Sequence, residues 1–192
     1  RAFTSKEKIG KFEGAFHGVH DGVSVSIGPP IEEAGDPKRP VGYLQSQLGP
    51  SGAGISQRVL EEVLILPFND FPSTQRLLEE NSEDLAAVII DPIMSASGYP
   101  PIRDNFLSKL RDLTEELGIL LIFDEVISVR VDRGGVQGLF NVNPDLTTVG
   151  KTIGGGFPVG AFGGREDIMQ VFDPTDGPPQ VAHSGTFNAN PI

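Results

Sequence analysis

A run of large apolar residues in the middle of the chain places the strongest limit on its fold. Residues 119–123 read Ile-Leu-Leu-Ile-Phe and lead directly into Asp124 and Glu125. Before them, from Asp104 to Leu117, apolar residues recur at the i, i+3, i+4 spacing of an amphipathic helix, and Gly118 stands where a helix C-cap would. A short apolar run after a helix is typical of a strand buried on both faces of a parallel sheet. The sequence therefore predicts a buried strand that ends at the acidic pair.

Other segments of the chain favour the same alternation of strands and helices. Strands are predicted over Lys8–Glu13, Val63–Pro67 and Leu85–Ile90, and a short helix over Phe71–Glu80 with Ser73 as a possible cap. The stretch from about Gly28 to Gln57 is rich in Gly, Pro and Ser without a sustained period, so we expect a long loop there. Strands that alternate with helices imply right-handed crossovers and an α/β fold with a mostly parallel sheet.

Composition excludes several classes of function. The net charge of −11 argues against nucleic acid or an anionic membrane as a partner, because phosphate recognition needs clustered Lys and Arg. The chain has no cysteine, which excludes disulfides, zinc-thiolate sites and thiol nucleophiles and fits a cytoplasmic location. No apolar stretch approaches the roughly 18 residues that span a bilayer. His20 and His183 belong to no ligand pattern and the sequence has no other ligand cluster, so we expect no metal site.

Asp124 and Lys151 form the strongest candidate site. Asp124 should emerge at the C-terminal end of its strand, where open α/β sheets bind their ligands. Lys151 lies in the segment Val-Gly-Lys-Thr-Ile-Gly-Gly-Gly, whose glycines give the backbone freedom close to the amine. An acid and an amine that meet on one small molecule suggest pyridoxal phosphate, because an acid holds its ring nitrogen protonated and a lysine forms the Schiff base.

Other interpretations of these residues stay open. Taken singly, Asp124 fits a helix cap or a carboxylate in solvent, and Lys151 fits a surface charge. Gly150-Lys151-Thr152 also resembles the end of a Walker A loop, and Asp124-Glu125 resembles the magnesium-binding strand of P-loop ATPases. That match is incomplete, because Asp145 holds the place of the first glycine and the loop normally precedes the acidic strand.

Four blocks of sequence carry a resemblance to a known family. They are Lys11-Phe12-Glu13-Gly14-Ala15-Phe16-His17-Gly18, Ile122–Val126, Pro144–Gly164 and His183–Pro191. Together they resemble the class III pyridoxal-phosphate aminotransferases, and the nearest branch looks like glutamate-1-semialdehyde 2,1-aminomutase and its relatives. The resemblance implies fold type I, a three-layer α/β/α sandwich. It also implies that residues 1–192 are a partial cofactor-binding large domain, with the upstream phosphate loop and the C-terminal small domain outside it.

The resemblance implies roles for individual residues. Lys151 would carry the cofactor as a Schiff base and move the substrate proton, and Asp124 would pair with the pyridinium nitrogen. Val126 would pack under the ring from the same side of the strand as Asp124. Phe16, where the family usually has tyrosine, would stack on the other ring face. His17 beside it would contact the cofactor region, although a structural turn histidine is an equal alternative.

Further implied contacts involve the cofactor's surroundings and a second subunit. Gly18 would lie beside the cofactor with Phe16 and His17. Gly185 and Thr186 would bind the cofactor phosphate of the neighbouring subunit, which implies a homodimer with shared active sites, although alone these two residues fit a plain turn. Asp91-Pro92 stands where relatives usually have Glu-Pro, one methylene longer.

The function that the resemblance implies is transfer of an amino group between an amino acid or amine and a keto or aldehyde acceptor. Both substrates would be small molecules. Alternatives within the family are the intramolecular transfer of an aminomutase and racemase or epimerase chemistry on the same scaffold. An inactive fragment that mediates subunit association is the alternative from another class.

Overall fold

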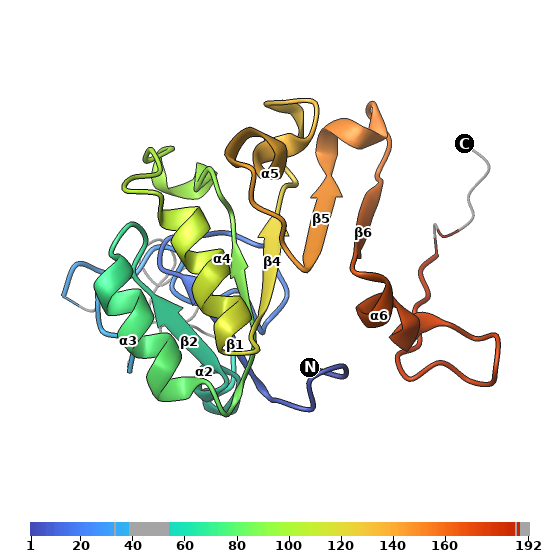
Figure 1. The fold of residues 1–192 in the computed structure, drawn as a ribbon, viewed down its shortest axis with the longest axis horizontal. Coiled ribbons are helices and arrows are strands. Elements are labelled where there is room, and N and C mark those ends of the chain that lie inside the picture. Colours follow the sequence, from blue (N-terminus) through green and yellow to red (C-terminus); the bar gives the residue numbers. More distant parts are fainter. Residues whose placement is uncertain (33, 39–53, 187, 189–192) are drawn as a thin grey trace.

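A six-stranded sheet forms the centre of the computed structural model, which describes residues 1–32, 34–38, 54–186 and 188. The strands are β1 (Lys8–Phe12), β2 (Val63–Leu66), β3 (Leu85–Ile90), β4 (Leu120–Asp124), β5 (Leu146–Gly150) and β6 (Gly160–Gly164). They lie in the order β2-β1-β3-β4-β5-β6, and all neighbours pair parallel except β6, which runs antiparallel to β5 (Figure 1). The predicted mostly parallel sheet is confirmed.

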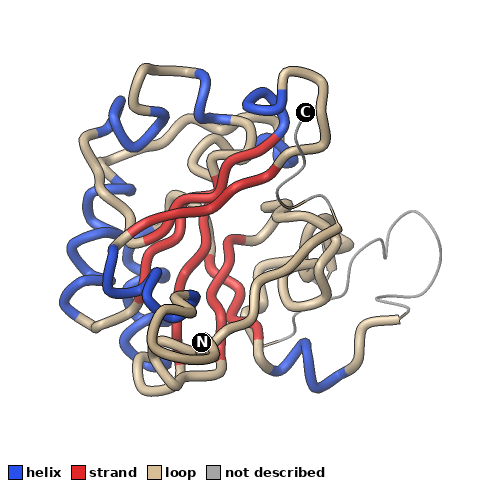
Figure 2. The backbone as a smooth tube through the Cα atoms, turned by 90° about the vertical axis from the view of Figure 1, so that its right-hand side faces the viewer, coloured by secondary structure: helices blue, strands red, loops and turns tan. Residues whose placement is uncertain are grey.

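Helices cover both faces of this sheet. They are α2 (Gln57–Glu61), α3 (Phe71–Asn81), α4 (Phe106–Glu116), α5 (Gly135–Phe140) and α6 (Glu166–Met169). Helices α3 and α4 pack on one face, and Leu60 of α2 and Ile168 of α6 pack on the other. Figure 1 shows α3 and α4 side by side in front of the strands. In Figure 2, turned by 90°, most helical segments lie on one side of the strands and loop segments lie on the other. Of the described helices, none combines the length and apolar character needed to cross a membrane.

The main apolar core lies between the sheet and helices α3 and α4. Phe12 of β1 and Phe123 of β4 are fully buried in it, together with Leu78 of α3 and Leu110 of α4. The Phe12 ring meets the ring of Phe106 edge to face, with 5.6 Å between the centroids. Burial of one such side chain contributes about 1.5–3 kcal/mol. Packing of this kind holds the strands in place, and with them the residues at the strand ends.

Two helix starts differ from the sequence-based expectation. Ser73 does not cap α3. The cap is Asp70, whose side chain accepts the backbone N–H of Ser73 at 3.2 Å. Helix α4 begins two residues later than expected, because Asp104 and Asn105 have φ of 50° and 58°, in the left-handed region outside the helix. Gly118 has a φ of 64° and follows α4, as the C-cap prediction required.

Two strands and three short helices were missed. The sequence analysis assigned no strand or helix after Asp124, whereas the structure has β5 and β6 there, with α5 between β4 and β5 and α6 after β6. Strand β6 consists of Gly-Ala-Phe-Gly-Gly and is largely exposed, so it gives no apolar pattern. The predicted loop over Gly28–Gln57 ends where α2 begins, and its residues 33 and 39–53 lie outside the described part of the chain.

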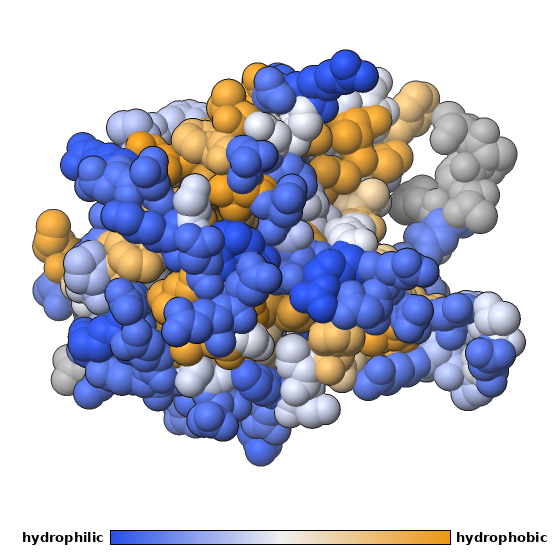
Figure 3. All heavy atoms as spheres, in the orientation of Figure 1, coloured by the Kyte–Doolittle hydropathy of each residue, from blue (hydrophilic) through white to orange (hydrophobic). Residues whose placement is uncertain are grey.

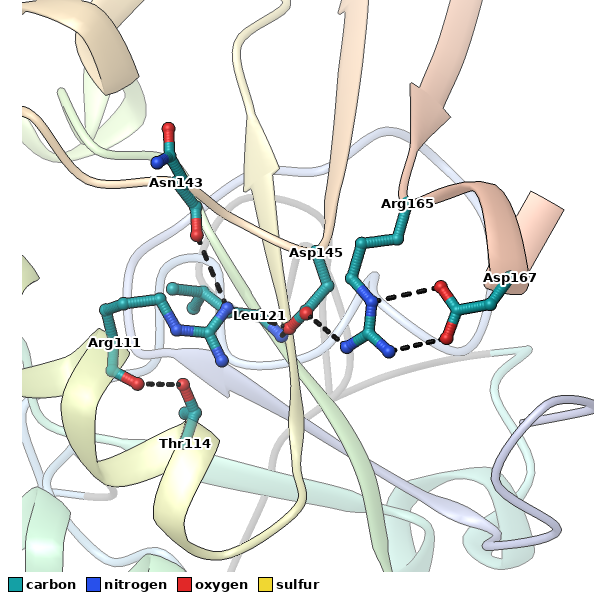
Figure 4. Close-up of polar contacts among 7 residues, drawn as sticks. All are labelled: Arg111, Thr114, Leu121, Asn143, Asp145, Arg165 and Asp167. Atoms are coloured by element: carbon teal, nitrogen blue, oxygen red, sulfur yellow. Dashed lines mark hydrogen bonds and ion pairs between the residues drawn. The ribbon is translucent and has the colours of Figure 1, made fainter.

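A charged network holds the amino end of the sheet together. The carboxylate of Asp145, just before β5, accepts the N–H of Leu121 in β4 at 2.7 Å and pairs with Arg111 of α4 at 2.9 Å (Figure 4). Arg165, just after β6, reaches the same carboxylate at 2.8 Å and also binds Asp167. Burial raises the pKa of Asp145, but the Leu121 N–H and the two guanidinium groups outweigh burial and lower it. Asp145 thereby connects β4, β5, β6 and α4.

Candidate active site

A pocket of about 290 Å³ lies at the carboxyl ends of the parallel strands. The ends of β3, β4 and β5 and the loop after β1 form its walls. Its lining includes six residues that the sequence analysis assigned to the site: Phe16, His17, Gly18, Asp124, Val126 and Lys151. Segments far apart in the sequence therefore meet at the edge where open α/β sheets bind ligands. A larger cavity of about 750 Å³ lies at the amino end around Asp145, whose carboxylate is already held by two arginines.

Asp124 is the last residue of β4 and points into a set of hydrogen-bond donors. Its Oδ2 lies 2.7 Å from Nδ1 of His17, and its Oδ1 accepts the N–H of Val126 at 3.1 Å and the hydroxyl of Thr148 at 3.3 Å. Burial raises the pKa of Asp124, but His17 and the other donors outweigh burial, so the pKa lies below its usual range. Asp124 is therefore an anion at neutral pH.

His17 is held rigidly beside Asp124. Only 1% of its side chain is exposed, and Nδ1 faces the carboxylate. Within the described residues, its Nε2 is buried without a hydrogen-bond partner. The side chain thus acts as a structural link between the loop after β1 and the end of β4, and it also lines the pocket. Contact between His17 and the cofactor stays a prediction.

Lys151 follows the last residue of β5 and opens a single 3-10 turn, Lys151–Gly154. Its side chain lines the pocket and its φ is 47°, a left-handed conformation that costs a residue other than glycine about 1 kcal/mol or more. Such strain is often found at functional sites. A P-loop lysine would instead open an α-helix after its strand. The P-loop alternative is therefore wrong for this chain.

Glu125 belongs to the structural support behind the pocket. It is fully buried, and its carboxylate accepts the backbone N–H groups of Val136 at 2.8 Å and Gln137 at 3.1 Å. Gly135 approaches it so closely that an added Cβ would lie 2.3 Å from a Glu125 oxygen. The two acidic residues therefore have different roles: Asp124 faces the pocket, and Glu125 holds α5 against the end of β4.

The pocket also contains residues that the sequence analysis did not assign to it. Thr148 pairs with Asp124 in the register of β5 and β4 and donates to its carboxylate. Asp91, at the end of β3, uses its carboxylate within its own turn, accepting the N–H groups of Ile93 and Ser95. The β-branched residues of β5 were the available signal for Thr148, because they favour a strand next to β4.

Two positions lie elsewhere. Gly185 and Thr186 are exposed and are absent from the lining of this pocket. Val126 does line the pocket, but it lies in the turn after β4 and not in the strand itself. The segment before Gly185 rests against β6, because the ring of His183 meets the ring of Phe162 edge to face at 5.4 Å. In the part of the chain that the structure describes, no three or more His, Cys, Asp or Glu side chains gather as a metal site.

The donor set of the pocket fits pyridoxal phosphate. An anionic carboxylate at one side suits a protonated ring nitrogen, an amine at the same pocket suits an aldehyde, and Phe16 and Val126 supply apolar walls for a flat ring. A mostly parallel α/β sheet with an acid and a lysine at its carboxyl edge is typical of cofactor-binding α/β enzymes.

Comparisons with known proteins agree with this class. The family model for class III aminotransferases matches residues 1–192. Glutamate-1-semialdehyde 2,1-aminomutase of Ignicoccus hospitalis is 44% identical over the whole chain, which spans 42% of that protein. An omega-transaminase structure from Sphaerobacter thermophilus matches with a TM-score of 0.89 and 49% identity, covering all of this chain and 42% of that one. A structure described as a transaminase with PLP bound gives a TM-score of 0.86 and 36% identity, again over all of this chain and 42% of the other.

The chain belongs to the class III aminotransferase family. Its predicted fold class is confirmed by the sheet and by these structural neighbours. The chain spans less than half the length of the relatives it matches.

Proposed function

We propose that the protein transfers amino groups between an amino acid or amine and a keto or aldehyde acceptor, with pyridoxal phosphate held by Lys151. The observation that carries this proposal is the presence of Asp124 and Lys151 in one pocket at the ends of adjacent strands. When bound, the cofactor supplies an electron sink that stabilises negative charge on the substrate carbon. The chain's own residues then have to hold it, orient it and move a proton.

Asp124 would hold the ring nitrogen in its protonated form. Its lowered pKa keeps the carboxylate charged, and a charge-assisted hydrogen bond to the nitrogen is stronger than a neutral one. His17, Val126 and Thr148 fix the direction of the two carboxylate oxygens. Such preorganisation means that the anion does not have to reorient during the reaction.

Lys151 would serve first as the covalent anchor and then as the general base. Its amine, once released by the incoming substrate amine, would take the proton from the substrate carbon and return it at the next position. Phe16 and Val126 would restrict the ring to one plane between β1 and β4, and Gly18 would leave space beside it. An inactive full-length protein is disfavoured because both Asp124 and Lys151 are present, whereas an inactive fragment that mediates subunit association stays an alternative for residues 1–192 alone.

Two reactions of the family compete as the detailed assignment. The omega-transaminase shares 49% identity with this chain and the curated aminomutase 44%, so we propose the transaminase reaction first and the aminomutase reaction second. They differ in one measurable way. A transaminase needs a separate acceptor before a second round, whereas an aminomutase turns over with its single substrate. Turnover of glutamate-1-semialdehyde without an added acceptor would select the second.

We also propose a homodimer with shared active sites. Gly185 and Thr186 are exposed and outside the pocket, as expected of residues that act on a neighbour's cofactor phosphate. Apolar side chains that follow Lys151 are exposed as well: Ile153, Phe157, Val159 and Phe162. Figure 3 shows an apolar surface where β5 ends and β6 begins. Mixing Thr186→Ala with Lys151→Ala protein tests the sharing. In a shared arrangement one of the two mixed sites carries both lesions and the other none, so part of the activity returns.

The chain would be the cofactor-binding part of a larger enzyme, since it spans 42% of its relatives. The cysteine-free sequence suits a reducing compartment, so we also propose a cytoplasmic location. The test of the function is a half-reaction: full-length protein with pyridoxal phosphate receives an amine donor, and the pyridoxamine form of the cofactor is followed by absorbance. No conversion with any amine or amino acid in a broad panel, despite bound cofactor, would reject amino transfer.

A further inference from the structure

A lysine lies in the interior of the sheet next to the pocket. Lys11 belongs to β1, and none of its surface is exposed. Lysine is almost never fully buried unless its amine has partners, because a charge loses its hydration there. Successive side chains of a strand point to opposite faces, and Phe12, next to Lys11, packs in the core with α3 and α4. Lys11 therefore points to the face that loop segments cover.

The amine of Lys11 joins two parts of the loop after β1. Its Nζ donates to the carbonyl oxygen of Ala15 at 2.9 Å and to the carbonyl oxygen of Val25. Ala15 immediately precedes Phe16, and Val25 lies on the returning limb of the same loop. Two further hydrogen bonds close the same loop: the Gly14 N–H donates to the carbonyl of Ser26 at 2.8 Å, and the Ser24 hydroxyl donates to the carbonyl of Gly18 at 3.1 Å.

The number of partners fits an uncharged amine. Among the described residues Lys11 has two acceptors, and a neutral amine has two N–H donors, whereas an ammonium has three. Burial lowers the pKa of Lys11 to about 7, and the nearby Glu13 only partly opposes this. Above neutral pH the amine thus satisfies both carbonyls without a buried charge.

We propose that Lys11 is a positioning residue: through the carbonyls of Ala15 and Val25 it fixes the loop that brings Phe16 and His17 to the pocket wall. The main chain of Ala15 leads directly into these two residues, and His17 in turn contacts Asp124 at 2.7 Å. Lys11 touches neither the pocket nor its ligand, and acts on both through the loop. The consequence for cofactor binding rests on the function proposed above, whereas the consequence for the loop does not.

The test compares two variants of the same strand by hydrogen exchange in the full-length protein without added cofactor. Lys11→Met keeps the length of the side chain but leaves two buried carbonyls without a donor. Lys8→Met is the matched control, because Lys8 lies on β1 and pairs with Asp84 at the surface. We expect amides of residues 14–26 to exchange at least about tenfold faster in Lys11→Met, with β3 and β4 unchanged, and no such change in Lys8→Met.

A third variant separates hydrogen bonding from packing. Lys11→Gln retains two N–H donors and should restore part of the protection over residues 14–26, together with part of the affinity for pyridoxal phosphate measured by its absorbance. Unchanged exchange in Lys11→Met, or an equal increase through β3 and β4, would overturn the proposal. So would a failure of both Lys11 variants to fold while Lys8→Met folds. A wild-type protein that binds no pyridoxal phosphate would reject the proposed function. The exchange data would still test whether Lys11 fixes the loop.

Discussion

Two buried aspartates lie at opposite ends of the same pair of strands, and their surroundings differ. Asp124 ends β4 at the carboxyl edge, where an imidazole, one N–H and one hydroxyl hold it at the wall of a pocket. Asp145 precedes β5 at the amino edge and is held by two guanidinium groups and one N–H (Figure 4). The pKa of both carboxyls is lowered.

The pKa of both carboxyls is shifted in the same direction, so the shift does not distinguish a binding carboxylate from a structural one. The groups that contact each carboxylate do distinguish them. Arginine is charged at every accessible pH, so the two cations beside Asp145 neutralise it permanently. Among the described residues no guanidinium group pairs with Asp124, and its carboxylate faces space that a ligand can enter. We therefore expect substitutions at the carboxyl edge to affect chemistry and substitutions at the amino edge to affect stability.

The largest effect is expected from Lys151→Ala at the carboxyl edge. The variant should lose the covalent link to pyridoxal phosphate and all measurable turnover, because no other amine among the described residues lines the pocket. Its melting temperature should stay close to that of the wild type, since Lys151 is exposed. Absorbance after cofactor addition, together with calorimetry, measures both. Retained visible absorbance would place the anchor on another residue.

Asp124→Asn should come next. The carboxamide cannot keep the ring nitrogen protonated, so we expect the lysine-linked cofactor to form while proton abstraction slows by on the order of 10²-fold or more. Stopped-flow measurement of the half-reaction with an α-deuterated amine isolates this step. A normal rate would show that another group holds the nitrogen.

Asp145→Asn should lower stability and leave cofactor binding unchanged, the opposite of what we expect for Asp124→Asn. Removing the charge leaves Arg111, largely buried, without its anion, which we expect to lower the free energy of unfolding by about 2–3 kcal/mol. The value lies at the low end for a broken buried pair, because Arg165 is half exposed and remains hydrated. Cofactor affinity per folded molecule should not change. Denaturant titration and absorbance at a permissive temperature measure these effects, and a loss of cofactor without a loss of stability would break the comparison.

The pH dependence of stability gives a further distinction. Because the folded pKa of Asp145 lies below its unfolded value, the stabilisation is complete above a pH of about 4 and is lost as the pH falls through the folded pKa. The difference in unfolding free energy between wild type and Asp145→Asn should therefore shrink on acidification. Chemical denaturation at a series of acidic pH values measures it, and a constant difference would assign the effect to packing instead of charge.

The smallest effect is expected from Thr148→Val. The substitution removes one donor from Asp124 and nearly keeps the shape, so cofactor affinity should fall only a few-fold, corresponding to about 1 kcal/mol. Thr147→Val is the control, because Thr147 neighbours it on β5 and its hydroxyl accepts from Gln137 instead. Equal effects of both substitutions on cofactor affinity would show that the hydrogen bond from Thr148 to Asp124 does not contribute to cofactor binding.

The sequence located the carboxyl edge better than the amino edge, for a physical reason. A continuous apolar run predicts a strand and thereby the position of the carboxylate at its end, so Asp124 followed from local pattern alone. The partners of Asp145 come from α4 and from the segment after β6. A local periodicity in the sequence does not predict contacts between residues so far apart. The cap at Asp70 and the glycine-rich strand β6 were missed because the first competes with a neighbouring serine and the second lacks an apolar alternation.

The pocket at the carboxyl edge is tested most directly by trapping the cofactor on its anchor. Full-length protein is mixed with pyridoxal phosphate, its visible absorbance is recorded, the link is reduced with borohydride, and the modified peptide is identified by mass spectrometry. We expect a visible band and a single modified lysine at Lys151. Absence of any stable adduct, or modification of surface lysines such as Lys8 and Lys109 in place of Lys151, would contradict the assignment of this pocket.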